Sequence, residues 1–411
     1  SRAAVRMEAL TALGEVACPP GDAAETVREA AAALTEEGGA WQVAAQALRS
    51  LARLDPDEAA RLLPRFAGHR DPFVRAHAAR VAATLEDRRT LGPLSVDESA
   101  NVRSAAIEGL FELQGHGIDP LLRAHLVSDD PWLLLTTARL LSGAPEREET
   151  AEAALTAFER ISEARRETWR DPRRALLALV GEMGGPAAAP EHGATRATPT
   201  AGDEAPPADS ALAERLRPYL TDHDPLVAAD VAAILAAWTG EPHEPAPEPL
   251  PRVPFPSIQE VDRLEHTTVT LHMRDLGPIV IRPLPHAAVT NAARFVRLAE
   301  RGYYDGLTFH RHAPNFVIQG GSPGANEYAG DGPYTRDEIE HPHWRGTVGL
   351  STRGRDTGDA QIFINLVHNL RLDADYTVFG EVIEGMEVAD RVLEGALIER
   401  AEVRVEAGAT P

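Results

Sequence analysis

The chain has 411 residues, of which 43% are hydrophobic and 25% are charged. Because that length exceeds what one small core needs, we expect two or more domains. No apolar run approaches the roughly 20 residues of a membrane helix, which argues against direct membrane insertion. The net charge of −22 predicts an acidic surface. An acidic surface repels phosphate groups, so nucleic acids and anionic membranes are not expected as partners.

The first residue bears on the compartment, whereas the cysteine count leaves the redox compartment undecided. Cys18 is the only cysteine, so no disulfide within the chain and no cysteine-based zinc site is expected. The chain begins at Ser1, without a methionine and already inside a helical pattern, which indicates a processed or truncated product. We therefore favour a periplasmic or other extracytoplasmic location, after removal of an N-terminal signal, over a cytoplasmic one.

Residues 1–239 are rich in Ala and Leu at helical spacing and contain a repeated pattern. Its fullest form is Asp-Pro-x-Val-Arg-x-x-Ala-Ala, and related segments recur about every 30 residues. The clearest copies are residues 71–80, 99–108, 130–134 and 224–231, and residues 39–45 fit more loosely. An Asp before Pro caps and starts a helix, and small Ala residues let that helix pack closely on a neighbour.

One helix pair cannot bury its apolar face alone, so consecutive pairs must stack. The pattern resembles HEAT repeats, and this resemblance implies an α-solenoid over residues 1–239. A solenoid presents a long surface and has no chemistry of its own. It serves either as a rigid spacer or, as we favour, as a platform for a protein partner or client.

Two segments interrupt the regular patterns. Residues 186–208 are rich in Pro, Ala, Gly and Thr and predict a disordered insert. Residues 240–258 carry prolines at nearly every other position, which predicts an extended linker. Such a segment could also be a ligand for an aromatic groove, but a change of domain at this place favours the linker.

Residues 259–408 show strand patterns instead. Two strands are expected around 269–273 and 279–281, followed by a helix with Thr290 as its N-cap and Gly302 at its end. Further strands are expected at residue 309 and beyond, at 348–350, at 361–364 and at 376–379, with a second helix near 387–393. Short strands and two helices predict a closed antiparallel β-barrel with helices over its ends.

Residues 309–321 combine a guanidinium, an aromatic ring and an amide. The run Phe316-Val317-Ile318 before two glycines predicts a strand, on which Arg311, Phe316 and Gln319 would stand in a fixed relation. A polar clamp beside an apolar floor suits a ligand with amide and hydrophobic parts. The alternative is a surface Arg and Gln flanking an ordinary core strand.

Five ordered motifs then carry a family resemblance. They are residues 302–306, 309–321, 356–364, 372–373 and 376–380. Together, over roughly residues 264–405, they strongly resemble the cyclophilin-type peptidyl-prolyl cis-trans isomerases. The resemblance implies an eight-stranded barrel that rotates Xaa-Pro bonds in proline-containing polypeptides, with no cofactor and no metal.

The same resemblance assigns roles to individual residues. Arg311 takes the place of the catalytic arginine, and Gln319 holds the substrate backbone. The proline pocket is assigned to four apolar residues, namely Phe316, Val317, Phe363 and Leu372. Backbone at Ser351, Thr352 and Arg353, with the side chains of Gln361 and Tyr376, completes the groove.

Some positions depart from the family pattern or suggest other chemistry. Ile362 stands where the family usually has Phe, and Arg371 stands where relatives often have Trp or His, so substrate preference and cyclosporin sensitivity are open. Tight cyclosporin binding is disfavoured by Arg371.

The alternating histidines His310, His312, His341 and His343 could suggest a metal site, but they lack further ligands at suitable spacing.

Taken together, these patterns predict a bacterial foldase with HEAT-like repeats and a cyclophilin-like domain. Its repeats would recruit clients or dock onto a large protein complex. The alternative is a structural subunit of a larger, membrane-associated assembly, in which the barrel is mainly a binding module.

Overall fold

The computed structural model describes residues 2–15, 25–26, 29–30, 40–185 and 211–406. They form two compact units, Ser1–Gly109 with Arg252–Pro411, and Leu110–Pro251. The insert predicted at residues 186–208 lies outside the described residues, as does Cys18. Within the described part of the chain, no helix is both long and apolar enough to cross a membrane.

The predicted N-terminal helical region is confirmed. Its α-helices are α1 (Arg2–Glu15), α3 (Trp41–Leu54), α4 (Pro56–Ala67), α5 (Pro72–Thr84), α6 (Arg88–Leu94), α7 (Ala100–Gln114), α8 (Asp119–His125), α9 (Pro131–Leu140), α10 (Arg147–Ser162), α11 (Arg170–Gly184), α12 (Ala211–Leu216) and α13 (Pro225–Thr239). Short 3-10 helices lie at Gly115–Ile118, Glu167–Trp169 and Arg217–Thr221. The assignment to HEAT-like repeats stays a prediction.

The Asp-Pro pairs start helices as their chemistry requires. The Asp71 carboxylate accepts a hydrogen bond from the backbone N–H of Phe73 at 2.9 Å, and Asp224 accepts one from Leu226 at 2.9 Å. Asp130 caps α9 in the same way. In each case the proline follows in the first turn, where its missing N–H leaves no bond unmade.

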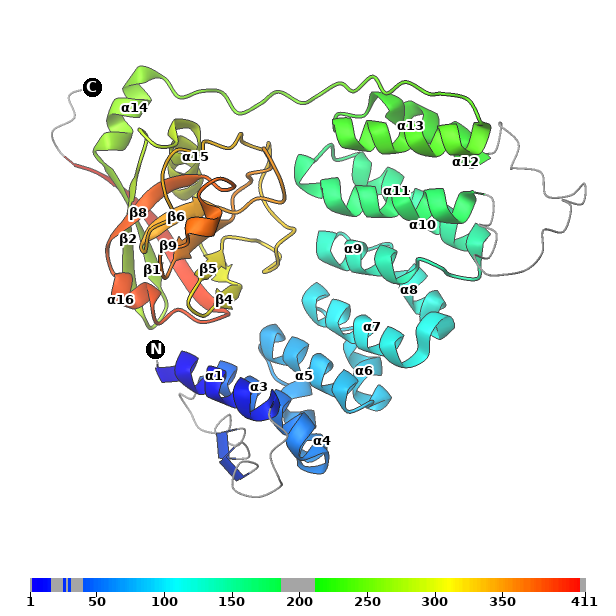
Figure 1. Cartoon of the computed structure of the whole chain (residues 1–411), viewed down its shortest axis with the longest axis horizontal. Helices are drawn as coiled ribbons and strands as arrows, with labels where there is room; N and C mark the ends of the chain where they lie inside the picture. The colour runs from blue at the N-terminus through cyan, green and yellow to red at the C-terminus, as the bar shows by residue number, and fades with distance from the viewer. Residues whose placement is uncertain (1, 16–24, 27–28, 31–39, 186–210, 407–411) are drawn as a thin grey trace, which may run out of the picture. The chain divides into compact units, whose positions relative to one another are not determined.

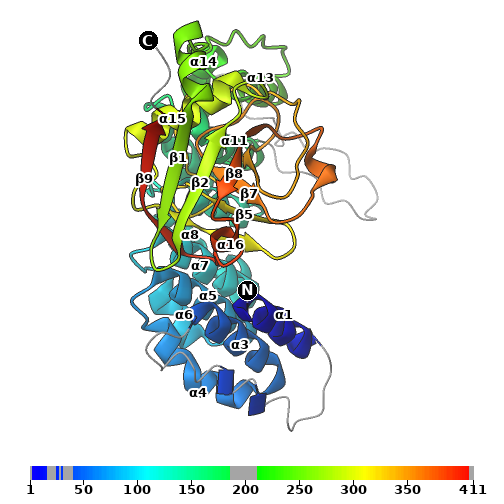
Figure 2. The ribbon, with the colours of Figure 1, turned by 90° about the vertical axis from the view of Figure 1, so that its left-hand side faces the viewer.

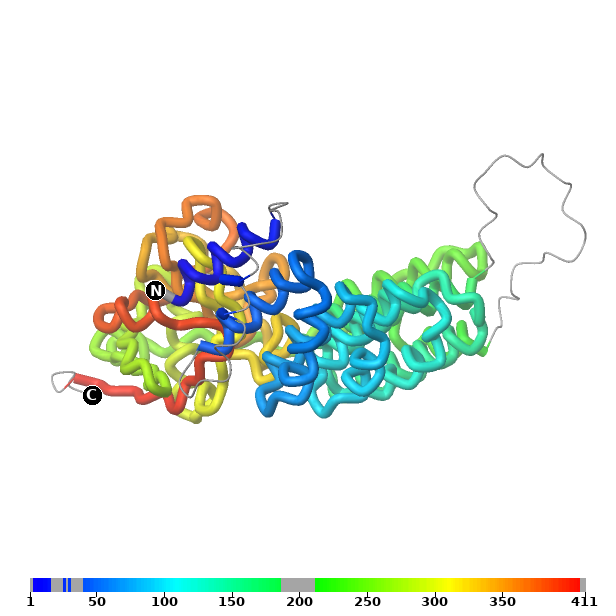
Figure 3. The backbone as a smooth tube through the Cα atoms, turned by 90° about the horizontal axis from the view of Figure 1, so that it is seen from below, coloured from blue at the N-terminus to red at the C-terminus, as the bar shows by residue number. Residues whose placement is uncertain are grey.

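In the second unit the helices stack in successive layers. Helix α11 packs on α10 and contacts both α9 and α13, an order that can be followed in Figure 1 and, from below, along the cyan-to-green tube of Figure 3. Fully buried Leu and Val side chains fill the space between them, among them Leu155, Leu176, Val180 and Leu235. Residues 241–256 then take no regular secondary structure.

The C-terminal part of the first unit is a nearly closed antiparallel β-barrel. Its strands are β1 (Thr267–Met273), β2 (Gly277–Pro283), β3 (Thr308–Phe309), β4 (Arg311–Ala313), β5 (Val317–Gly320), β6 (Thr347–Leu350), β7 (Ile362–Asn365), β8 (Val378–Glu384) and β9 (Ala396–Val405). They follow the order β3-β9-β1-β2-β8-β6-β7-β5-β4. Figure 2 shows β9, β1 and β2 side by side.

The barrel closes through one short stretch of chain, residues 308–313. Its first part, β3, pairs with β9, and its second part, β4, pairs with β5. His310 breaks the strand between them. If β3 and β4 are counted as one bent strand, the nine strands become the eight that the family resemblance implies.

The barrel core is formed by side chains that alternate inward along the strands. Val269, Leu271, Ile281, Phe309 and Phe379 are fully buried members of one cluster. Helix α15 (Val289–Glu300) covers this core, and the helices α14 (Ile258–Glu265) and α16 (Met386–Ala389) and the 3-10 helix Leu370–Leu372 complete the fold. Helix α14 and strand β9 were not predicted from the sequence.

The start of α15 differs from the prediction that Thr290 is its N-cap. The backbone N–H groups of Thr290 and Asn291 donate instead to the two carboxylate oxygens of Glu338, at 3.1 and 3.0 Å. A carboxylate suits this place because the first N–H groups of a helix lack partners and carry partial positive charge. The cap therefore comes from a distant loop and not from the helix itself.

Candidate functional site

The predicted strand at residues 309–321 is in fact a hairpin. Strands β4 and β5 pair so that Arg311 lies opposite Gln319. Pro314 and Asn315, whose φ of +53° is left-handed, make the turn between them. Phe316 belongs to this turn and not to one strand with Arg311 and Gln319, so the expectation of a single strand was wrong.

The hairpin starts a directed chain of hydrogen bonds. Arg311 Nη1 donates to Gln319 Oε1 at 3.1 Å, which turns the Gln319 NH2 group toward Ser351 Oγ at 3.0 Å and Gln361 Oε1 at 3.3 Å. Gln361 Nε2 in turn donates to the carbonyl of Ala329 at 2.9 Å. Each amide is thus fixed in one orientation by its neighbour, because a donor must face an acceptor.

An apolar cluster lies beside this polar chain and is separate from the barrel core. Buried Val317, Phe363 and Leu372 form it, and the half-buried Ala313, Phe316 and Tyr376 pack against it. The cluster draws its members from the hairpin, β7 and the segment before β8. It provides the apolar floor that the sequence predicted beside Arg311 and Gln319.

The ring of Phe363 is held in place from several sides. It stacks on His343 with ring centroids 5.6 Å apart and meets Tyr376 edge-on at 6.0 Å. On a third side it lies so close to Gly349 that a Cβ there would be 2.3 Å from the ring. Strand β6 therefore needs a glycine at this position, and the ring position is fixed.

His343 is a structural residue of this wall. It is fully buried, its Nε2 lies 3.0 Å from the Tyr376 carbonyl, and its Nδ1 lies 3.2 Å from the amide nitrogen of Asn365. Because a carbonyl can only accept, we assign the ring proton to Nε2. Burial lowers the pKa of His343 from its ordinary value, which keeps the ring neutral beside Phe363.

The polar chain and the apolar cluster meet in one cavity of about 220 Å³. All the predicted site residues line it except Gln361, whose side chain lies behind Gln319. The lining residues are Arg311, Phe316, Val317, Gln319, Glu327, Ser351, Thr352, Arg353, Phe363, Leu372 and Tyr376. Of these, Glu327 was not predicted, because it stands in a glycine-rich loop without periodicity.

The cavity has charged groups at its rim. Arg311 is partly exposed, with Glu327 Oε1 at 3.6 Å from its Nε. Arg371 is exposed and stacks its guanidinium over the ring of Phe316, 4.0 Å from the centroid. Such a contact favours a cation over an aromatic face, so the rim carries guanidinium groups above an apolar floor.

The other predicted histidines offer no metal site in the described part of the chain. There, no group of three His, Cys, Asp or Glu side chains is arranged to hold an ion. His310 is buried next to Arg311, and burial lowers its pKa to about 4. The ring is therefore neutral at neutral pH and adds no charge beside Arg311.

Comparisons with known proteins bear on residues 268–406. The sequence pattern described as "Cyclophilin type peptidyl-prolyl cis-trans isomerase/CLD" matches this range. "Peptidyl-prolyl cis-trans isomerase B" of Bacillus subtilis is 39% identical over 137 residues, which cover 33% of this chain and 94% of that protein. The "Peptidyl-prolyl cis-trans isomerase" of Helicobacter pylori is 35% identical over 143 residues, covering 34% and 88%. The chain belongs to the cyclophilin-type peptidyl-prolyl cis-trans isomerases.

The enzyme class predicted from the sequence is thereby confirmed. Among solved structures, a cyclophilin type isomerase of Cryptosporidium parvum is similar at 22% identity and a TM-score of 0.33, over 34% of this chain and 98% of that chain. A second structure of it, in the presence of the dipeptide Ala-Pro, gives a TM-score of 0.31 and covers 99% of that chain. The family match spans residues 268–406, so it covers the cyclophilin barrel and none of the N-terminal helical region.

Proposed function

We propose that the barrel catalyses cis-trans isomerisation of Xaa-Pro bonds in proline-containing polypeptides, with Arg311 as the catalytic residue. One observation carries this proposal beyond the family membership. A guanidinium and a separate apolar cluster line the same cavity: Arg311 supplies its charged part, and Val317, Phe363 and Leu372 supply its apolar part. A proline ring needs the apolar side, and the rotating amide bond needs the charged side.

The barrier that the site must lower comes from resonance in the peptide bond. Rotation about that bond costs about 18–20 kcal/mol, because the nitrogen shares its lone pair with the carbonyl. As the bond twists, the prolyl nitrogen becomes pyramidal and its lone pair becomes available as an acceptor. An Arg311 N–H then donates to the twisted nitrogen more strongly than to the planar one. Stabilising the twisted state over the planar state is what accelerates the rotation.

The remaining residues hold the substrate for that step. Val317, Phe363 and Leu372 fix the proline ring, and their apolar surface strengthens the interaction with Arg311 by lowering the local dielectric. Gln319 keeps its Oε1 on Arg311, and the second lone pair of that fixed oxygen can accept a backbone N–H of the substrate. Because the rotation breaks no covalent bond and moves no proton, the mechanism assigns no step to a cofactor or a metal.

Substitution of Arg311 tests the proposal. We expect Arg311→Ala to lower kcat/KM for a Xaa-Pro tetrapeptide by about 100-fold, as removal of one stabilising donor does in other enzymes. Arg400→Ala is a matched control, because Arg400 is exposed on β9, pairs with Glu402 and does not line the cavity. Equal activity of Arg311→Ala and the parent, with both folded, would refute the catalytic role.

For the rest of the chain we propose a division into a HEAT-like platform at 1–239, a linker at 240–258 and the isomerase at 259–408. The recurring Asp-capped helices support the platform. A photo-crosslinking residue at Val127, which is 77% exposed in the helical region, tests it against an unfolded, proline-containing protein. The platform predicts crosslinks from this position. Crosslinks formed only by a probe on the barrel, at Val405, would contradict it.

A further inference from the structure

The loop between β6 and β7, residues 351–361, contains a buried ion pair that the proposed chemistry does not use. Arg353 Nη1 lies 3.4 Å from Asp359 Oδ2, and the Asp359 side chain is fully buried while that of Arg353 is 15% exposed. The other carboxylate oxygen accepts the backbone N–H groups of Ala360 and, at 2.9 Å, Gln361. Asp359 therefore fixes the backbone at Gln361, the residue that orients Gln319.

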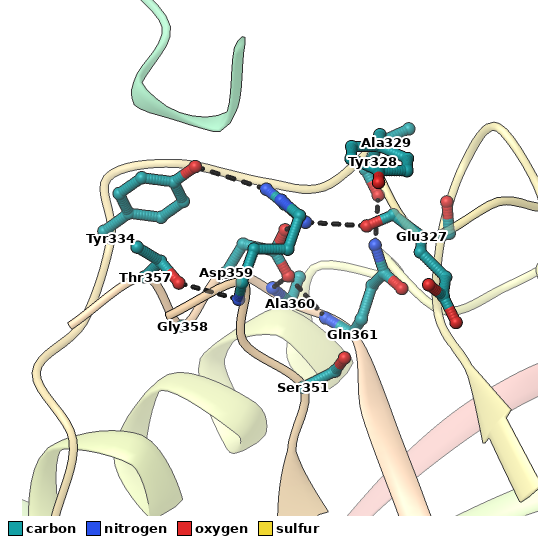
Figure 4. A network of polar contacts seen from close by, with 12 residues as sticks. Glu327, Tyr328, Ala329, Tyr334, Ser351, Thr357, Gly358, Asp359, Ala360 and Gln361 are labelled. Atoms are coloured by element: carbon teal, nitrogen blue, oxygen red, sulfur yellow. Dashed lines mark hydrogen bonds and ion pairs between the residues drawn. The ribbon is translucent and has the colours of Figure 1, made fainter. Parts of the chain in front are cut away.

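Arg353 extends from this loop to a second segment, residues 327–334. Its Nη1 donates to the Glu327 carbonyl at 2.7 Å and its Nη2 to the Tyr334 hydroxyl at 3.2 Å. Its guanidinium also lies over the ring of Tyr328, 5.7 Å from the centroid. Figure 4 shows Glu327 and Tyr334 on one segment and Asp359 and Gln361 on the other.

The two segments are packed against each other at Asp359. A Cβ on Gly330 would lie 2.1 Å from Asp359 Oδ2, so no larger residue fits there. Next to it, the carbonyl of Ala329 accepts the Gln361 side chain at 2.9 Å. Segment 327–334 thus supplies the last acceptor of the hydrogen-bond chain that begins at Arg311.

We propose that Asp359 and Arg353 are positioning residues, which latch segment 327–334 onto loop 351–361 and so keep the Gln361–Gln319 chain oriented toward Arg311. This inference rests on the proposed isomerase function. If the latch opens, Gln361 loses its acceptor at Ala329, and its amide is then held at the oxygen end by the 3.3 Å bond from Gln319 without the bond that fixed its NH2 group. Gln319 can then turn its NH2 group toward Arg311, where the two donors repel each other.

Burial makes the pair a unit rather than two separate contacts. A buried carboxylate is costly unless hydrogen bonds and a counter-ion compensate it. Burial raises the pKa of Asp359 while the Arg353 charge opposes that rise. Removing Arg353 therefore leaves an uncompensated charge next to Gly330 and separates the two segments, although neither residue takes part in the bond rotation.

The latch is tested in the full chain with Arg353→Met and Arg353→Lys. The Met variant keeps the apolar part of the side chain without its charge. The Lys variant keeps the positive charge, but its single ammonium group can hydrogen-bond to segment 327–334 or to loop 351–361 and not to both at once. Arg355→Met is the matched control, because Arg355 belongs to the same loop, is 64% exposed and does not line the cavity. Circular dichroism and thermal melting establish that each variant is folded.

Two readouts separate positioning from simple substrate contact. The first is amide hydrogen exchange of residues 327–334 in the free protein, which we expect to be about tenfold faster in Arg353→Met and near the parent's rate in Arg355→Met. The second is the kcat and KM for a Xaa-Pro tetrapeptide. We expect a fall in kcat of about tenfold, because small misplacements of catalytic groups act on the rotation step, with partial recovery in Arg353→Lys.

The outcomes discriminate between the possible roles. Faster exchange together with a lower kcat supports the latch. Unchanged exchange, or a change in KM alone, overturns it and leaves Arg353 as a substrate contact. If the parent protein has no isomerase activity, the proposed function fails, and the exchange measurement alone then decides whether the latch exists.

Discussion

Gly349→Ala is the substitution whose effect follows most directly from the geometry of the site. The Phe363 ring lies directly over this glycine, and the added Cβ would meet three of its carbons at 2.3, 2.7 and 2.8 Å. Carbon atoms in contact normally stay about 3.5–4.0 Å apart. The ring must therefore move by about 1 Å or more. Strand β6, the stacked His343 and the edge-on Tyr376 already flank the ring, so we expect it to move toward the cavity that it lines.

Two free-energy costs follow from this displacement. Forcing an extra methyl group into a packed site costs about 1–3 kcal/mol of unfolding free energy. A ring pushed into the cavity also occupies part of its roughly 220 Å³, so the proline ring of the substrate no longer fits against the apolar cluster. Burial of one apolar side chain is worth about 1.5–3 kcal/mol. Its loss should lower kcat/KM by at least about tenfold.

The assay measures both costs on the full chain. Urea unfolding gives the change in stability, and a Xaa-Pro tetrapeptide gives kcat/KM. Gly92→Ala is the matched control, because the same methyl group there meets nothing within 4 Å. If Gly349→Ala keeps the parent's stability and kcat/KM, the placement of Phe363 against β6 is wrong, and with it the wall of the proposed proline pocket.

Three further predictions concern stability and protonation. Asp71→Ala removes the cap on the Phe73 N–H and should cost about 1 kcal/mol of unfolding free energy in a urea titration; no change would mean that the cap is not formed. Glu338→Ala removes the acceptors at the start of α15 and should cost about 1–2 kcal/mol in the same assay, whereas a Thr290→Ala variant should retain most of the stability. The lowered pKa of His343 predicts that stability is lost as pH falls below about 6.5, because the unfolded state then binds a proton that the native ring resists. An NMR titration of His343 at or above the ordinary histidine value would contradict this.

The residues predicted for the site gather around one cavity because their ordered motifs lie on neighbouring strands and on the loops that join them; their roles stay predictions. Arg311 and Gln319 were expected to be neighbours, and they are, although a hairpin and not a single strand brings them together. The turn at Asn315 was missed because one left-handed residue between Pro and Phe hardly changes the pattern of apolar residues from which the strand was predicted. In either arrangement, a single strand or a hairpin, the guanidinium of Arg311 and the amide of Gln319 stand near each other.

Features that depend on distant parts of the chain could not be predicted locally. Strand β9 alternates apolar and charged residues weakly, and it is a strand because it pairs with both β1 and β3. The start of α15 is capped by Glu338, 48 residues from Thr290. Glu327 and Asp359 stand in loops without periodicity, so nothing in the local pattern placed them at the cavity or behind it.

The central claim, that the barrel turns Xaa-Pro bonds rather than merely binding them, is tested most directly by exchange NMR. The measurement follows the cis and trans signals of a Xaa-Pro peptide in the presence of a small, catalytic amount of the full chain. A catalyst accelerates the exchange and leaves the cis-to-trans ratio of the free peptide unchanged. We expect this result for the parent and the Arg400→Ala control, and an acceleration about 100-fold smaller for Arg311→Ala. Exchange at the uncatalysed rate with the parent protein, under conditions where the peptide binds, would contradict the account and identify the barrel as a binding module.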